Sequence, residues 1–155
     1  MQVITAPDDA VPHHTTLFLA GGITNCPDWQ ADTLHHLKDL PITVYNPRRP
    51  NFPIKDPLAA EKQILWEYRA LCASDVISFW FCAETLNPIV LFELGSWLRS
   101  PKPLFIGCHP GYSRIKDVVI QTGLVRPKQV VTVSVDPTPM VEHLKTYLKS
   151  VEVGA

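Results

Sequence analysis

Glu93 is a carboxylate in an otherwise apolar predicted helix, within the stretch NPIVLFELGSWL of residues 87–98. Ile89, Val90 and Trp97 lie about one turn away from it, so the carboxylate shares an apolar face. Burying a carboxylate is costly unless it has partners or a task. Burial raises its pKa, whereas hydrogen bonds or a nearby positive charge lower it. Two interpretations stay open: a functional carboxylate, or a structural Glu paired with an Arg beneath a loop.

Gln63 and Glu67 form a second candidate group, in the sequence QILWE. They lie one turn apart and share one face of a predicted helix. In a functional interpretation, the pair offers a planar amide and a carboxylate to a heterocycle. In the alternative interpretation this face is solvated, and Trp66 is an ordinary core residue.

Two glycines and two arginines fall in loops that follow predicted strands. Gly21 and Gly22 allow the backbone to approach a ligand closely, but they are not part of a GxGxxG dinucleotide fingerprint. Arg48 and Arg49 are candidates for binding phosphate or for balancing an acidic pocket, and a solvated loop is an equal alternative. Asp75 stands at the amino end of a predicted strand, where we expect a structural turn or cap residue.

Strands alternate with helices along the chain, which predicts a parallel sheet covered on both faces. We predict strands at residues 16–20, 43–46, 76–81, 104–107 and 129–134, and helices at residues 29–40, 59–73, 87–100, 113–122 and 137–150. Asn87 is expected to cap the third helix with its side chain, with Pro88 in the first turn. Residues 1–14 are predicted to be an irregular arm. The sequence thus predicts one α/β domain over residues 1–155, with a doubly wound sheet of about five strands in the order 2-1-3-4-5.

In such a sheet, ligands bind beyond the carboxyl ends of the strands, where the strand order reverses. Three predicted loops meet there, at residues 21–24, 47–52 and 83–87. Glu93 lies on the adjoining helix. We therefore predict a pocket that is polar, aromatic and acidic.

Composition disfavours several classes of function. The net charge of −1 argues against a nucleic-acid partner, and no apolar run or leader pattern predicts a membrane segment or secretion, so a cytoplasmic protein is expected. The sequence has no HExxH or GxSxG pattern, which disfavours metal catalysis and serine hydrolysis. Free thiols are expected rather than disulfides or zinc, because the four cysteines show no CxxC spacing: Cys26, Cys72, Cys82 and Cys108.

Four sequence blocks in order, LFLAGGI, QxxWE, DVISFWF and NPIVLFELG, resemble the nucleoside 2-deoxyribosyltransferase family over about residues 17–105. The similarity is to the branch with QxxWE and N-x5-E-x-G. It implies a flavodoxin-like fold and exchange of the base of a 2′-deoxynucleoside through a covalent deoxyribosyl-glutamate intermediate. It also implies a role in nucleotide salvage, no cofactor, and a homo-oligomer in which a neighbouring subunit contributes residues.

The resemblance implies roles for individual residues. Glu93 falls at the position of the nucleophile, and Glu67 at that of an acidic residue that assists the base or orients the nucleophile. Asn87 and Phe18 stand where well-known members have an acidic residue and a tyrosine, which bears on binding of the sugar hydroxyls and on orientation of the nucleophile. The substrate-binding candidates are Gly21, Gly22, Asn87, Gln63, Trp29, Phe52 and Arg49. Trp29, Phe52 and Trp80 are the candidates for stacking on the base.

Two other functions remain as alternatives. A hydrolase on the same scaffold would cleave deoxynucleosides or their 5′-monophosphates, with water resolving the intermediate. A non-catalytic nucleotide-sensing module is the second, and Glu93 in an apolar helix face argues against it. In each case the partners are a nucleoside or nucleotide and, for the transferase, a free nucleobase.

Overall fold

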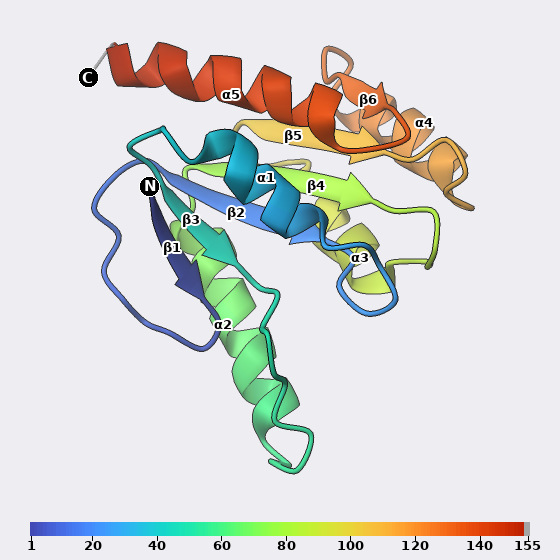
Figure 1. Ribbon diagram of the computed structural model, residues 1–155. Helices are drawn as coiled ribbons and strands as arrows, with labels where there is room; N and C mark the ends of the chain where they lie inside the picture. Colours follow the sequence, from blue (N-terminus) through green and yellow to red (C-terminus); the bar gives the residue numbers. More distant parts are fainter. Residues whose placement is uncertain (154–155) are drawn as a thin grey trace.

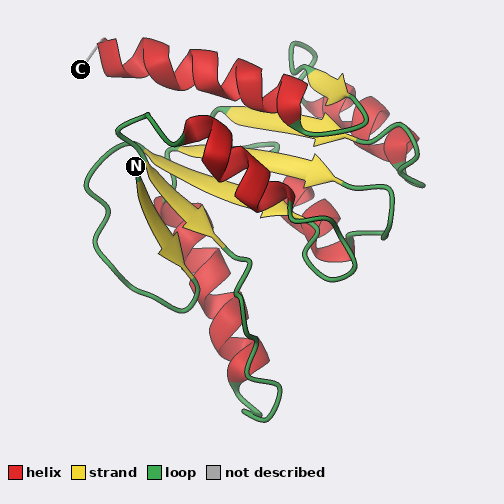
Figure 2. Ribbon diagram, in the orientation of Figure 1, coloured by secondary structure: helices red, strands yellow, loops and turns green. Residues whose placement is uncertain are grey.

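The computed structural model describes residues 1–153 and contains a six-stranded parallel sheet (Figures 1 and 2). Its strands are β1 (Gln2–Thr5), β2 (Thr16–Gly21), β3 (Thr43–Asn46), β4 (Val76–Phe81), β5 (Leu104–Cys108) and β6 (Val131–Val133). They lie in the order β1-β3-β2-β4-β5-β6, and every neighbouring pair is parallel. Strands β2 to β6 follow the predicted 2-1-3-4-5 order, so the prediction of a doubly wound, flavodoxin-like α/β fold is confirmed.

β1 is an additional strand at the edge of the sheet, inside the segment predicted to be an irregular arm. It pairs in parallel with β3 along its whole length. Ile4 is 1% exposed and belongs to the core. The prediction for residues 1–14 is therefore wrong at residues 2–5, because this short strand is followed directly by the polar, proline-containing stretch of residues 6–14.

Five helices cover the two faces of the sheet: α1 (Trp29–Leu37), α2 (Ala59–Ala73), α3 (Pro88–Trp97), α4 (Ile115–Val125) and α5 (Thr138–Val153). Figure 1 shows α1 and α5 on one face and α2, α3 and α4 on the other. The core divides in the same way: Leu37 and Leu144 share one apolar cluster, and Trp66, Leu94 and Val118 share the second. None of the helices within residues 1–153 is long and apolar enough to cross a membrane.

β4 lies between β2 and β5, and all six of its residues are buried. Ile77, Phe79 and Phe81 belong to the cluster beneath α2 and α3, whereas Val76 and Trp80 belong to the cluster beneath α1 and α5. This alternation follows from the two-residue period of a strand. The apolar run therefore forms a strand buried on both faces, as predicted.

Asp75 ties β2 to β4 at their amino ends. Its Oδ2 atom accepts hydrogen bonds from the backbone N–H and from the hydroxyl of Thr16, both at 2.8 Å. The backbone N–H of Asp75 donates to Thr16 Oγ1, also at 2.8 Å. These contacts agree with a structural role for Asp75, at the end of the sheet opposite to the carboxyl ends of the strands.

We predict that Asp75→Asn lowers the free energy of unfolding by about 1–2 kcal/mol, because a neutral amide accepts hydrogen bonds more weakly than a carboxylate. Urea unfolding and turnover of the folded protein should be measured side by side, with exposed Asp9→Asn as the control for lost charge. A variant with unchanged stability and lost turnover would contradict this assignment.

Candidate active site

A cavity of about 250 Å³ opens where β2 and β4 end and α3 begins. Five of the predicted site residues line it: Gly21, Gly22, Glu67, Asn87 and Glu93. They come from the end of β2, from α2 and from the start and middle of α3. The doubly wound topology brings these elements together, because the strand order reverses between β2 and β4.

Glu93 lies in this cavity as a largely buried carboxyl group. Burial and, to a lesser extent, the nearby negative charge of Glu67 together raise the pKa of Glu93 to about 8. Within residues 1–153, the ion pairs join Arg48 to Asp28, Lys62 to Asp56 and Arg114 to Asp117, and none includes Glu93. The structural interpretation, a Glu paired with an Arg, therefore has no support in the described residues.

Glu67 supplies the second carboxyl group of the cavity. Burial raises the pKa of Glu67, and a hydrogen bond from Gln63 partly offsets this rise. Gln63 Nε2 donates to Glu67 Oε1 at 2.8 Å and to the carbonyl oxygen of Pro47 at 3.0 Å. Gln63 is not among the residues that line the cavity, so it lies behind Glu67 and fixes the orientation of that carboxylate.

The family model described as nucleoside 2-deoxyribosyltransferase like matches residues 14–112. The chain belongs to this family. The matched segment runs from the residues before β2 to beyond β5, and it contains both carboxylates of the cavity. A search of curated proteins found no match.

Asn87 and Phe18, the two positions at which the resemblance implies a difference from well-known family members, both line the cavity. Asn87 has a left-handed backbone with φ of 50°, which Asn tolerates better than most residues. Its Nδ2 atom donates to the carbonyl oxygens of Thr85 at 3.1 Å and Cys82 at 3.4 Å. The predicted side-chain cap of α3 is therefore wrong, because the amide turns back towards the end of β4 and shapes the turn before α3.

The aromatic candidates for stacking on a base lie away from the cavity. Trp29 and Trp80 are 2% and 3% exposed, and both belong to the core beneath α1 and α5. Trp29 Nε1 donates to the carbonyl oxygen of Gly22 at 3.2 Å, so the indole supports the cavity loop from behind. Phe52 is 45% exposed, with the guanidinium of Arg49 5.5 Å from its ring centre. Contrary to expectation, neither residue of this last pair lines the cavity.

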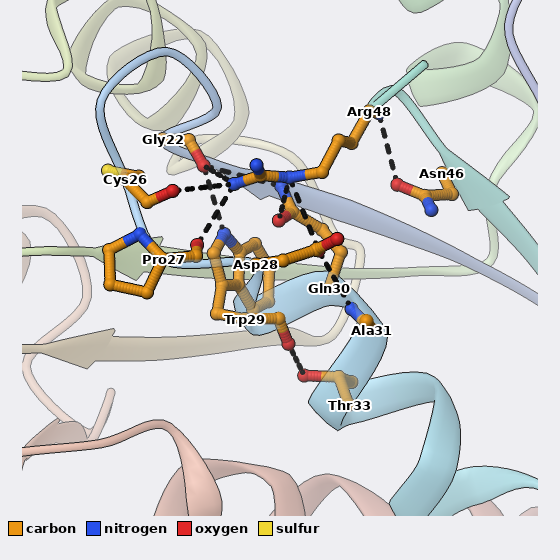
Figure 3. A network of polar contacts seen from close by, with 10 residues as sticks. All are labelled: Gly22, Cys26, Pro27, Asp28, Trp29, Gln30, Ala31, Thr33, Asn46 and Arg48. Atoms are coloured by element: carbon orange, nitrogen blue, oxygen red, sulfur yellow. Dashed lines mark hydrogen bonds and ion pairs between the residues drawn. The ribbon is translucent and has the colours of Figure 1, made fainter. Parts of the chain in front are cut away.

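Arg48 holds the loop of residues 22–28, which follows β2 (Figure 3). Its Nη2 atom donates to the carbonyl oxygens of Pro27, Gly22 and Cys26 at 2.9, 3.3 and 3.3 Å. Its Nε atom lies 2.9 Å from Gln30 Oε1 and 3.2 Å from an oxygen of Asp28. The guanidinium of Arg48 therefore already has partners within the protein, which disfavours a role for it in binding phosphate.

Cys26 and Cys82 form a disulfide, with their Cα atoms 6.4 Å apart. The expectation of free thiols is therefore wrong for this pair, whereas Cys72 and Cys108 are free. The two bonded cysteines are 56 positions apart, and they meet because β2 and β4 are neighbours in the sheet. Sequence spacing alone contains no sign of this pairing.

The same corner holds the group of residues best suited to bind a metal within the described chain: Cys26, Cys82 and Glu84. Metal binding by cysteine requires the thiolate. In the disulfide, each sulfur is bonded to the other, so neither is available as a thiolate ligand.

Proposed function

We propose that the protein exchanges the base of 2′-deoxynucleosides, with Glu93 as the nucleophile that forms a covalent deoxyribosyl intermediate. The observation that supports this most directly is a buried carboxyl group that lines the cavity, has no cationic partner among the described residues and lies near a second carboxyl group. The family adds the substrate class, deoxynucleosides and free bases.

The proposed first step breaks the bond between the base and C1′ of the sugar. Positive charge builds on the sugar, and the Glu93 carboxylate stabilises it and then bonds to C1′, as in retaining glycosidases. The electron pair of the broken bond leaves with the base, which receives a proton from Glu67. A second base then attacks C1′, displaces Glu93 and returns a proton to Glu67.

These two steps require that the two carboxyl groups share one proton. At the start of the reaction Glu67 carries this proton and Glu93 is ionised. Burial raises the pKa of each group, and the negative charge of Glu67 adds to the pKa of Glu93. The two groups therefore titrate as a coupled pair, in which ionisation of one opposes ionisation of the other. Gln63 favours the charged form of Glu67, so in the free protein the proton rests on Glu93, and it must pass to Glu67 before the first step.

We predict that Glu67→Gln slows base exchange and moves the rising limb of the pH profile of kcat/KM to lower pH. Loss of the Glu67 charge makes ionisation of Glu93 easier, so the pKa of Glu93 falls from about 8 towards its ordinary value. It stays above that value, since burial is the larger cause. An unchanged pH profile in Glu67→Gln would show that the two carboxyl groups do not interact; Glu61→Gln, an exposed change on the same helix, is the control.

The alternatives lead to different products from the same substrate. The protein should be incubated with a deoxynucleoside, with and without a second free base, and the mixture separated by chromatography. Base exchange gives a new deoxynucleoside only when the second base is present. A hydrolase releases base and deoxyribose in both cases, and a sensing module leaves the substrate intact, so either result would contradict the proposal.

We also propose a cytoplasmic homo-oligomer that acts in nucleotide salvage without a cofactor, as the family resemblance implies. Apolar side chains on α2 and α3 are compatible with contact between copies: Tyr68 is 65% exposed and Phe92 is 76% exposed. Light scattering of the purified protein measures its oligomeric state directly.

A further inference from the structure

The Cys26–Cys82 disulfide joins two segments that both border the cavity. Cys26 lies in the loop of residues 22–28, and Cys82 directly follows β4. Cys82 is 3% exposed, whereas Cys26 is only partly buried. A small thiol from solvent therefore approaches the bond from the Cys26 side.

The two sulfur atoms of the disulfide pack between this loop and the amino end of α3. Asn87 Oδ1 lies 3.6 Å from Cys26 Sγ and 3.7 Å from Cys82 Sγ. Gly22 faces the same corner, where an added Cβ would collide with the Asn87 side chain and with the Cys26 sulfur. The loop and the turn before α3 are thus packed against each other through the disulfide, and both line the cavity that contains Glu93.

A second set of contacts holds the two ends of the loop and does not depend on the disulfide. Arg48 donates to three carbonyl oxygens of the loop, and the side chains of Trp29 and Gln30 both donate to the carbonyl oxygen of Gly22 (Figure 3). Breaking the disulfide leaves these hydrogen bonds in place. The loop then loses its attachment to β4 and α3, while the sheet and its core keep their contacts.

We propose that Cys26 and Cys82 form a redox-controlled latch on the cavity. The oxidised pair holds the loop of residues 22–28 against the start of α3, and the reduced pair releases it and weakens ligand binding. Protein disulfides in reducing compartments are usually transient and catalytic or redox-sensing, which suits such a role. The latch itself rests on the disulfide and its neighbours, and only its effect on turnover rests on the proposed function.

The opening step is an exchange with a small thiol. The thiolate attacks Cys26 Sγ, the bond to Cys82 breaks, and Cys82 leaves as a thiolate that takes up a proton. A second small thiol attacks the mixed disulfide and frees Cys26 as a thiol. In sum, the protein gains two electrons and two protons while two small thiols become one small disulfide, and a small disulfide reverses the reaction.

Hydrogen exchange followed by mass spectrometry tests the latch in oxidised and dithiothreitol-reduced protein. A Cys72→Ser background removes the exposed free thiol, and intact mass reports the two added hydrogens. We expect the amides of residues 23–26, between the contacts that remain, to exchange about tenfold faster after reduction, with the amides of β2 and β4 unchanged. Equal exchange in the two states, or failure of the pair to form the bond under a small disulfide, would overturn the proposal.

Cys26→Ser provides a second test, because this variant cannot form the disulfide even without a reductant. The change is made at the less buried of the two cysteines. Its loop should exchange fast whether or not dithiothreitol is present. If base exchange is observed, KM for the deoxynucleoside should rise about three- to tenfold in the reduced and Cys26→Ser proteins, with kcat changed less than about twofold. A protein that turns over no deoxynucleoside contradicts the proposed function, while hydrogen exchange still decides whether the latch exists.

Discussion

Replacing Glu93 by Gln or Ala is expected to abolish base exchange while the fold survives. Removing the nucleophile of a covalent mechanism costs about 10⁴-fold or more in kcat, so about 0.01% or less of the activity should remain. Glu61→Gln, an exposed carboxylate on α2, is the matched control and should retain activity. Retention of more than a few per cent of activity in either Glu93 variant would remove Glu93 from the role of nucleophile.

A stability measurement separates loss of chemistry from loss of fold. The pKa of Glu93 is raised to about 8 in the folded protein, well above its value in the unfolded chain, so folding favours the protonated form. Its contribution to stability is therefore full below the unfolded pKa and is lost as pH rises through about 8. Glu93→Gln cannot ionise at this position. Its melting temperature should therefore fall less than that of the unmodified protein between about pH 5 and pH 8, which is the interval between the unfolded and folded pKa values of Glu93.

The sheet was predictable because its central strands carry a strong local signal. The run of residues 76–81 is apolar at every position except Ser78, and such a run is typical of a strand covered by helices on both faces of the sheet. β1 was missed because it is short and runs directly into a polar, proline-containing stretch at residues 6–14, which dominates the local pattern. Its pairing with β3 depends on the position of the rest of the sheet, which local sequence does not encode.

The site was predictable where a residue's place follows from the topology alone. Glu67, Glu93 and Gly22 meet because β2 ends at the switch point of the sheet and both α2 and α3 pack against β2. The direction of a side chain at the start of a helix does not follow in this way. Trp29 stands at the start of α1, beside the loop that lines the cavity, but its indole points into the core beneath α5. No pattern in the sequence shows whether such a side chain points into the cavity or into the core.

The contacts of Arg48 and of the cysteine pair could not be predicted, because their partners lie far away in sequence. Arg48 binds carbonyl oxygens at residues 22–27, which carry no side-chain signature. Cys26 meets Cys82 through the register of β2 and β4, in which Gly21 stands opposite Trp80. Predicting such contacts requires knowledge of how the strands pair and in which register, whereas the local sequence predicts only where the strands lie.

The largest expected preference among substrates is for 2′-deoxynucleosides over ribonucleosides. Glu93 must attack C1′ from the face that carries the 2′-hydroxyl of a ribose. That hydroxyl would hydrogen-bond to the carboxylate in competition with the attack, and it withdraws electrons from the developing cation. An apolar pocket alone excludes an added hydroxyl only modestly, so this electronic cost is the main cause of the preference.

The walls of the cavity strengthen this expectation. Phe18, Ile89 and Val90 line it together with Glu93, and their side chains offer a 2′-hydroxyl no hydrogen-bond partner. Where the 2′-hydroxyl of a ribonucleoside faces these apolar side chains, it either stays unsatisfied or uses the nucleophile as its partner. Both outcomes raise the barrier, since an unpaired buried polar group costs about 1–3 kcal/mol.

We expect kcat/KM for deoxyadenosine to exceed that for adenosine by about 100-fold, which corresponds to roughly 2.7 kcal/mol of transition-state stabilisation. Both substrates should be measured with the same acceptor base. A matching pyrimidine pair is the control, because a preference set by the sugar persists when the base is changed. Equal values for the two sugars would reject the deoxyribosyltransferase and favour a general nucleoside hydrolase or a ribosyl-transferring enzyme, since Glu93 would then act without hindrance from the 2′-hydroxyl.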